Sequence, residues 1–344
     1  MSGGIDSSFA AYLLKKQGFK VLGITFQLLP DSLKNVCNPK ACCSLDTIHR
    51  AKRVADALSI PHYVINLRNE FKEYVIDKFI DAYKKGETPN PCVLCNKYIK
   101  FSSFVTKALS IGGEKIATGH YACIEEVSGT YLLKKGIDKT KDQSYFLYPI
   151  RTQLLESILF PLGKLRKTEV KTMAENAGWK NDGTKESQDI CFIPEGDYRG
   201  FLSKFVHLKK GPVFSVDGKR LGEHEGIHLY TVGQRRGLNI PYSEPLYVVE
   251  IRPYDNAVIV GPKDFLKKRY LTATGVNILH LSSTSVAGKV RYRQKEQPCH
   301  YTTEGDLLRV EFPQTIDAIM PGQSVVLYTN DTVVGGGTIK DSAI

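Results

Sequence analysis

The chain has 344 residues, 42% of them hydrophobic and 24% charged, which excludes a disordered chain and predicts two or three folded domains. Lys and Arg outnumber Asp and Glu by 47 to 36, and the resulting formal charge of +11 favours a polyanionic partner such as RNA. No apolar run approaches the roughly 20 residues that span a bilayer and no signal peptide is recognisable, so the sequence predicts a cytoplasmic protein with no membrane partner.

The first half of the chain predicts helices that alternate with short apolar strands. Ser7 or Asp6 can cap the first helix, and Gly18 can end it. The predicted helices cover 9–14, 46–58, 102–109 and 167–176, and the predicted strands cover 20–26, 62–66 and 115–118. This alternation is typical of a parallel sheet with helices on both faces.

Further along, the pattern changes to short strands that are rich in β-branched residues and separated by turn signals. The predicted strands cover 246–251, 257–260, 289–293, 307–312 and 324–328. Closely spaced strands without intervening helices indicate small barrels or sandwiches. We therefore predict an α/β domain with a parallel sheet over 1–196, a central β-rich bridging domain over 197–263 and a C-terminal β-barrel over 264–344.

The strongest local signal is a segment rich in glycine and serine directly before the first predicted helix. Its glycines let the backbone fold closely around a phosphate, its serines offer hydroxyl donors, and the helix start adds free N–H groups. It has no Lys, unlike a Walker A loop, and it resembles the PP-loop of ATP pyrophosphatases, which cut ATP between its α and β phosphates. The residues that this resemblance assigns to ATP are Ser2, Gly3, Gly4, Ile5, Asp6, Ser7 and Ser8. The alternative is a turn that only caps the helix.

Asp6 is the acidic residue of this loop, and we predict that it takes part in catalysis. A carboxylate beside the phosphates would bind Mg²⁺ or orient the reacting oxygen. A PP-loop normally follows a strand that anchors it in the sheet, whereas here the motif begins at residue 2. We therefore expect that an upstream apolar strand would raise both stability and ATP affinity.

Eight cysteines in so long a chain point to reactive or metal-binding thiols rather than to a disulfide framework. Cys92 and Cys95 form a CxxC pair after a proline-rich turn, and a thiol beside Lys97 near a helix start would have a lowered pKa. A CxxC pair can be a redox pair, half of a zinc site or a catalytic thiol. The other thiol in a polar, loop-like neighbourhood is Cys191, whereas Cys37, Cys42, Cys43, Cys123 and Cys299 are predicted to be core residues.

Seven motifs, in order along nearly the whole chain, together resemble those of the bacterial tRNA-specific 2-thiouridylases. They are the PP-loop and the segments 90–96, 117–122, 141–146, 160–163, 187–192 and 230–238. The resemblance implies an enzyme that uses ATP and Mg²⁺ to adenylate the 2-oxygen of the wobble uridine. Cys191 would then carry a persulfide whose outer sulfur attacks carbon 2, and Cys95 would release that sulfur and close a disulfide with Cys191.

The same resemblance implies binding residues and partners. It assigns Phe26 and Gly119 to ATP; Asn90, Pro91 and Cys92 to the target base; and Lys141, Asp142, Gln143, Arg291 and Tyr292 to tRNA. The tRNA partners would be those for Lys, Glu and Gln. A cysteine desulfurase or a sulfur-relay protein would donate the persulfide.

Three alternatives stay open from the sequence. Cys92, Cys95 and Cys191 could hold an iron–sulfur cluster instead of using a disulfide, although persulfide chemistry ranks above it. The chain could be another PP-loop adenylating enzyme, which would need no paired thiols. It could also be a non-catalytic RNA-binding relative.

Overall fold

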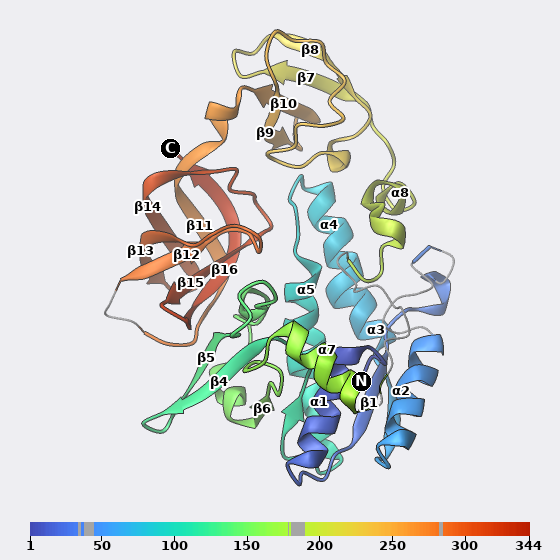
Figure 1. Cartoon of the computed structure of the whole chain (residues 1–344). Helices are drawn as coiled ribbons and strands as arrows, with labels where there is room; N and C mark the ends of the chain where they lie inside the picture. The colour runs from blue at the N-terminus through green and yellow to red at the C-terminus, as the bar shows by residue number, and fades with distance from the viewer. Residues whose placement is uncertain (34–35, 38–44, 178, 180–189, 282–284) are drawn as a thin grey trace. The chain divides into compact units, whose positions relative to one another are not determined.

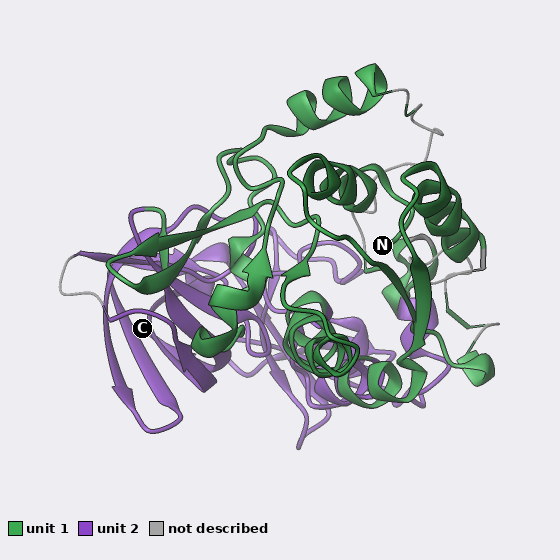
Figure 2. Ribbon diagram, turned by 90° about the horizontal axis from the view of Figure 1, so that it is seen from below, with its two compact units in different colours: residues 1–75, 92–198, 331–333 green, residues 76–91, 199–330, 334–344 purple. Residues whose placement is uncertain are grey.

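The structure is a computed structural model that describes residues 1–33, 36–37, 45–177, 179, 190–281 and 285–344. Contacts divide it into two compact units, shown in Figure 2. Unit 1 comprises residues 1–75, 92–198 and 331–333, and unit 2 comprises residues 76–91, 199–330 and 334–344. No helix in the described part of the chain is both long and apolar enough to cross a bilayer.

Unit 1 begins with the predicted alternation of helices and parallel strands (Figure 1). Its first elements are α1 (Ile5–Lys16), β1 (Gly23–Gln27), η1 (Asp31–Leu33), α2 (Leu45–Ala57) and β2 (His62–Asn66). β1 and β2 pair in parallel from Gly23 opposite His62 to Gln27 opposite Asn66. A second parallel pair joins β3 (Ile116–Ala117) to β6 (Ile158–Leu159). The parallel α/β prediction is confirmed.

Two long helical stretches of the chain contain π-helical segments. One runs through α3 (Arg68–Phe71), η2 (Lys72–Asp77) and α4 (Lys78–Lys84), and the other through α5 (Pro91–Leu94), η3 (Cys95–Ser103) and α6 (Phe104–Ser110). η2 and η3 are π-helices, and Phe101 inside η3 leaves helical geometry. Such segments are uncommon and occur often at functional sites. The second π-helix, η3, begins at Cys95 of the CxxC pair. The helical stretch that contains it begins at Pro91, about ten residues before the helix start that the sequence predicts at residue 102.

An antiparallel hairpin that the sequence analysis did not predict follows β3. It joins β4 (Ala122–Val127) to β5 (Thr130–Lys135). The remaining elements of unit 1 are η4 (Ser144–Phe146), η5 (Thr152–Ser157), α7 (Lys167–Asn176) and η6 (Pro194–Gly196). α7 has the bounds that the sequence predicts.

Unit 2 contains the two small β-rich folds that the sequence predicts. After α8 (Tyr198–Leu202), the first comprises β7 (Gly211–Ser215), β8 (Arg220–His224), η7 (Ile227–Leu229), β9 (Tyr247–Arg252) and β10 (Ala257–Gly261). Its strand order is β8-β7-β10-β9, and only the β7–β10 pairing among these described strands is parallel. Val213, Val248, Val258 and Val260 are buried in its core.

The second fold of unit 2 is a closed barrel that follows η8 (Lys263–Leu266). Its strands are β11 (Lys267–Ile278), β12 (Val286–Lys289), β13 (Gln297–Glu304), β14 (Leu307–Asp317), β15 (Ser324–Thr329) and β16 (Thr332–Ala343). The order β11-β14-β13-β12-β15-β16 closes because β16 also pairs with β11. The predicted strand 289–293 was wrong beyond Lys289. Val290 is still buried, but Arg291 and Tyr292 lie in the following loop, where cationic side chains need not face the core.

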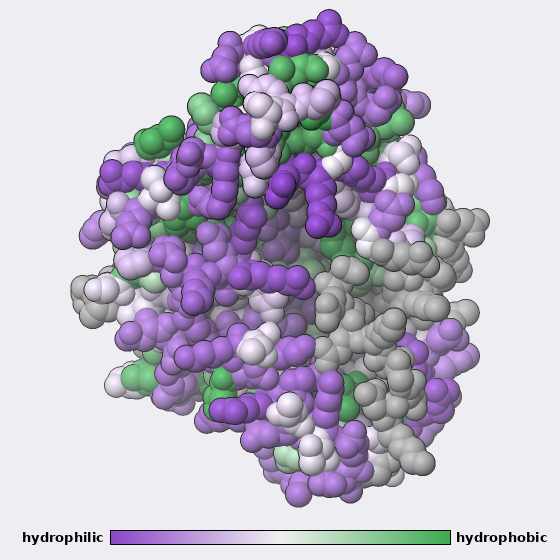
Figure 3. Space-filling view, turned by 45° about the horizontal axis from the view of Figure 1, so that its top comes forward, coloured by the Kyte–Doolittle hydropathy of each residue, from purple (hydrophilic) through white to green (hydrophobic). Residues whose placement is uncertain are grey.

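The described surface is mainly hydrophilic on the face in Figure 3, with hydrophobic residues scattered among polar ones. In the barrel, core and surface residues alternate along the strands. Leu308, Val310 and Phe312 are buried, whereas Arg309 is exposed. This alternation is the strand pattern that one buried face imposes.

Candidate functional site

The predicted phosphate loop forms a compact turn at the start of α1. The Ser2 amide donates to the Ser7 hydroxyl oxygen at 3.0 Å, and the Ser7 hydroxyl donates to the Gly4 carbonyl at 3.1 Å. Gly3 has a φ of +66°, and a Cβ there would lie 2.7 Å from the Arg50 side chain. Only glycine adopts this positive φ without strain and also leaves the space that the Arg50 side chain needs. The turn is therefore tight and depends on glycine at position 3.

Asp6, inside this loop, is held by two side chains that come from elsewhere in unit 1. The Lys167 ammonium contacts both carboxylate oxygens, at 2.6 and 2.7 Å, and the Tyr121 hydroxyl donates to Oδ1 at 2.8 Å. The Lys167 side chain is only 7% exposed, whereas that of Asp6 is 35% exposed. Both Asp6 oxygens thus accept from Lys167, and its predicted role as a Mg²⁺ ligand or as a group that orients the reacting oxygen stays a prediction.

Gly119 packs directly against the phosphate loop. A Cβ at this position would lie 2.9 Å from the Asp6 carbonyl carbon and from the Ser7 nitrogen. The backbone at residue 119 therefore comes this close to the loop only because it has no side chain. The predicted ATP residue Phe26 lies on β1, where its ring meets Phe104 at a centroid distance of 4.9 Å.

His120, next to Gly119, belongs to a buried polar chain. Its Nε2 lies 3.2 Å from the Lys100 ammonium, and its Nδ1 lies 2.7 Å from the Thr118 hydroxyl. Burial and then the Lys100 charge hold the pKa of His120 well below its ordinary value of 6.5. The ring is therefore neutral, with Nε2 accepting from Lys100 and the proton on Nδ1.

The two segments that carry Cys95 and Cys191 pack against the same helical stretch. Phe192, the neighbour of Cys191, meets Phe71 of α3 edge to face, with ring centroids 5.9 Å apart. Tyr98, three residues after Cys95, stacks on Tyr74 of η2 at 5.1 Å. Phe71 and Tyr74 lie within one turn of each other. Residues far apart in sequence thus meet one short stretch of helix.

The cysteines differ in how far solvent reaches them. Cys92 is exposed and Cys95, Cys123 and Cys191 are partly exposed, whereas Cys299 is buried. Burial raises the pKa of Cys299 to about 12. Among the described residues, no three His, Cys, Asp or Glu side chains gather as metal ligands, so Cys92, Cys95 and Cys191 present no ready iron–sulfur ligand set. Cys42, Cys43 and motif residues 187–189 lie outside the described residues.

The segment Lys141–Gln143, which the resemblance assigns to tRNA, reaches the phosphate loop through Tyr121. Two hydrogen bonds join Gln143 to the Tyr121 backbone. The Gln143 amide donates to the Tyr121 carbonyl, and the Tyr121 amide donates to the Gln143 Oε1, both at 2.9 Å. Asp142 is buried and accepts from the Gly136 and Ser144 amides and from the Ser144 hydroxyl. Asp142 and Gln143 therefore fix the local backbone, while Lys141 beside them is partly exposed.

The loop that leads into the CxxC pair is held within unit 2 by the turn before β15. The Thr88 amide donates to the Pro321 carbonyl at 2.8 Å, and the Gln323 Nε2 donates to the Thr88 carbonyl at 2.8 Å. Gly322 has a φ of +88°, and a Cβ there would lie 2.9 Å from three Thr88 backbone atoms. The turn thus fixes the chain two residues before Asn90.

Arg291 links the C-terminal barrel to the motif 230–238 within unit 2. Its Nη2 donates to the Ala318 carbonyl at 2.7 Å. A Cβ at Gly233, whose φ is +84°, would lie 3.3 Å from the same guanidinium nitrogen. Tyr292 lies under the Lys289 ammonium, 5.7 Å from the ring centroid. The motif 230–238 therefore lies next to Arg291, which the resemblance assigns to tRNA.

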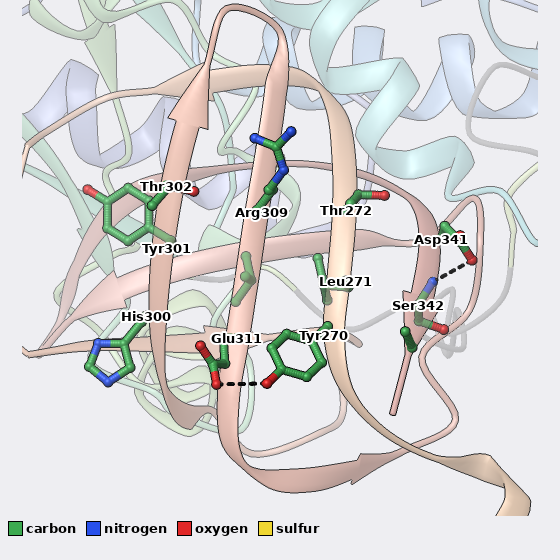
Figure 4. A pocket seen from close by; sticks show the side chains of 12 residues that line it. Tyr270, Leu271, Thr272, His300, Tyr301, Thr302, Arg309, Glu311, Asp341 and Ser342 are labelled. Carbon is green, nitrogen blue, oxygen red and sulfur yellow. Dashed lines mark hydrogen bonds between the residues drawn. The ribbon is translucent and has the colours of Figure 1, made fainter.

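A hollow of about 340 Å³ lies on the outer face of the barrel (Figure 4). Side chains of β11, β13, β14 and the end of β16 line it, and the Tyr270 hydroxyl donates to Glu311 at 3.1 Å. Its lining has no thiol and no phosphate-binding turn. The candidate active site is therefore the phosphate loop of unit 1 rather than this hollow.

The sequence analysis missed Lys167 and Tyr121. The one available signal was the position of Lys167 at the start of a predicted helix, where the helix dipole disfavours a cation. A lysine at this position does not stabilise the helix, so its placement indicates a role in a contact outside the helix.

Three family models cover the chain. They are described as a tRNA methyl transferase HUP domain (residues 1–195), a tRNA methyl transferase PRC-barrel domain (199–262) and an aminomethyltransferase beta-barrel domain (270–339). These matches and the fold define a HUP-domain protein that carries two β-barrel domains.

Full-length relatives narrow the class. The tRNA-specific 2-thiouridylase MnmA 2 of Clostridium tetani is 43% identical over 99% of this chain and 97% of its own length. The tRNA-specific 2-thiouridylase MnmA 1 of Caldanaerobacter subterraneus subsp. tengcongensis is 46% identical over 99% and 96%, and MnmA of Clostridioides difficile is 44% identical over 99% and 97%. The chain belongs to the tRNA-specific 2-thiouridylase family.

Proposed function

We propose that this chain uses ATP to replace the 2-oxygen of the wobble uridine of tRNA with sulfur, working in the cytoplasm. The observation that carries the proposal is the packing of the Cys95 and Cys191 segments on one turn of helix, through the Tyr98–Tyr74 and Phe192–Phe71 ring contacts. Family membership supports the same reaction.

ATP would be bound at the phosphate loop, with Ser2, Gly3, Gly4, Ile5, Asp6, Ser7, Ser8, Phe26 and Gly119 as its binding residues. The close approach of Gly119 to Asp6 and Ser7 supports this site, because a side chain there would displace the loop. Mg²⁺ would accompany the phosphates, with Asp6 beside them as its candidate ligand or as the group that orients the reacting oxygen. In the first step, the uridine 2-oxygen attacks the α phosphorus and pyrophosphate leaves with the bonding electrons.

Sulfur transfer would follow at the two thiols. Cys191 receives a sulfur atom as a persulfide from a cysteine desulfurase or a sulfur-relay protein. Its outer sulfur attacks carbon 2, the Cys95 thiolate attacks the inner sulfur, and AMP leaves with the original oxygen. The products are 2-thiouridine, AMP and a Cys95–Cys191 disulfide, which an external dithiol must reduce before the next turnover.

The substrate would be tRNA from the Lys, Glu and Gln acceptors. Asn90, Pro91 and Cys92 are proposed to meet the target base, and Lys141, Arg291 and Tyr292 to meet the RNA backbone or bases. Asp142 and Gln143 would act by fixing the backbone around Lys141, as their hydrogen bonds indicate.

The test combines two assays on the full chain. ATP–pyrophosphate exchange stimulated by tRNA reports adenylation, and mass spectrometry of the tRNA reports 2-thiouridine. Cys95→Ser and Cys191→Ser should abolish thiolation and keep exchange, while Cys123→Ser, on β4, should keep both. Thiolation that survives in both variants would rule out the thiol mechanism, and exchange by a wild-type chain that forms no 2-thiouridine with a persulfide donor present would favour another adenylating enzyme. A chain without exchange would be a binding protein.

A further inference from the structure

We propose that Lys167 is the phosphate-binding cation of this loop: it pairs with Asp6 when nucleotide is absent and contacts the β and γ phosphates of ATP when nucleotide is bound. The inference rests on the proposed function and adds to it a residue that no motif in the sequence identifies. It starts from the contact of the Lys167 ammonium with both Asp6 oxygens, at 2.6 and 2.7 Å.

The charge of the loop favours such a cation. Residues 2–8 contain one ionisable side chain, the acidic Asp6, and no lysine or arginine. A loop of that composition would repel the negative phosphates of ATP, and backbone N–H groups alone would have to overcome this repulsion. Lys167 neutralises Asp6 from a position 161 residues later in the chain.

The burial of Lys167 points the same way. Its side chain is 7% exposed, and removing an ammonium from water is costly even when it is paired. Lys167 is also the first residue of α7, where the helix dipole is unfavourable to a positive charge. A purely structural role would be served as well by two neutral residues.

The residues around Lys167 keep its ammonium beside the loop and still allow it to exchange Asp6 for a phosphate. The Lys167 amide donates to Asp138 at 2.9 Å, and the ammonium lies 5.7 Å from the centroid of the Tyr121 ring, whose hydroxyl also donates to Asp6. Asp6 keeps the Tyr121 hydroxyl as a donor if Lys167 turns to a phosphate. During adenylation the bond from the α phosphorus to the bridging oxygen breaks, and Lys167 would stabilise the charge that pyrophosphate carries away.

The experiment measures the binding of inorganic pyrophosphate to the full chain by calorimetry, without Mg²⁺, so that only the charges of the protein act. Lys167→Met should weaken binding by roughly 10- to 100-fold, the usual effect of losing a hydrogen bond to a charged group. Asp6→Asn should strengthen it, because Lys167 then loses its competing anion. The double variant Asp6→Asn/Lys167→Met should bind as weakly as Lys167→Met. The matched control is Lys164→Met, an exposed lysine just before α7.

The outcomes separate this proposal from the proposed function. Equal pyrophosphate affinity in Lys167→Met and the wild-type chain would overturn the role of Lys167 and leave the reaction standing. Restored affinity in the double variant would also overturn it, since Lys167 would then only neutralise Asp6. A wild-type chain that binds neither pyrophosphate nor ATP would overturn both. Thermal unfolding of each variant identifies any that fail to fold. If Lys167→Met is one of them, Lys167→Gln, which removes the charge and keeps a polar side chain, replaces it in the comparison with Lys164→Met and should show the same loss of binding.

Discussion

Gly322 lies so close to Thr88 that a methyl group on Gly322 would meet three backbone atoms of Thr88 at 2.9 Å. The contact joins the turn before β15 to the loop that leads into the CxxC pair. It is reinforced by the hydrogen bond from the Thr88 amide to the Pro321 carbonyl. The position of this loop therefore depends on the absence of a side chain far along the chain.

Replacing Gly322 with Ala should destabilise the fold and displace the loop. The φ of +88° alone costs about 1–2 kcal/mol for an L-residue, and the clash with Thr88 adds about 1–3 kcal/mol. The matched control is Gly218→Ala, where φ is +81° and no atom lies within 4 Å, so that only the first cost applies. Urea unfolding of the two variants gives both values, and equal losses would contradict the close contact.

The neutral His120 should make stability depend on pH. Its pKa is held well below 6.5 by burial and the Lys100 charge, so the unfolded chain takes up a proton near pH 6.5 that the folded chain refuses. The fold should lose stability as the pH falls from about 7 to 5, by up to about 1.4 kcal/mol per pH unit from this group. His120→Gln should flatten that decline, although His224 and His228, with pKa values also lowered by burial, preserve part of it. An unchanged slope in urea unfolding series would refute the assignment.

The thiols should separate into reactive and inert sets. Iodoacetamide at pH 8 should modify the exposed Cys92 first, and it should spare Cys299, whose pKa burial raises to about 12. Peptide mass spectrometry over time measures each rate, and a urea-unfolded sample, in which all eight cysteines react, is the control. Modification of Cys299 at the rate of Cys92 would show that the barrel core is open to solvent.

Arg291→Gln should weaken tRNA binding and lower its dependence on salt. One fewer cation at the RNA should reduce the slope of log affinity against log salt by about 1. The same variant should lower the melting temperature slightly, because the Ala318 carbonyl loses its 2.7 Å donor. Arg293→Gln removes a nearby exposed charge and is the control. If both variants show wild-type slopes in filter-binding titrations, the loop after β12 does not contact tRNA.

Local sequence predicted the elements whose signals lie within a few residues. The helix α7 and the strand β2 have the predicted bounds, because capping residues and short apolar runs act locally. The strand predicted over 289–293 ends at Lys289 in the structure. Of the β-branched and aromatic residues that follow, only Val290 is buried, and a loop can bury one such residue as well as a strand can. The domain boundaries and the roles of individual site residues stay predictions.

The sequence by itself determined the α/β class, because the alternation of helices with short apolar strands is a local pattern. It also singled out the glycine–serine loop, Cys95 and Cys191 as candidates from their residue types. Tertiary structure alone decided which groups meet: Lys167 with Asp6, and Gln143 with Tyr121. These contacts join residues that are far apart in the chain, and no local pattern encodes a distance across a folded core. The physical reason is that burial, not sequence spacing, brings opposite charges together and makes their pairing strong.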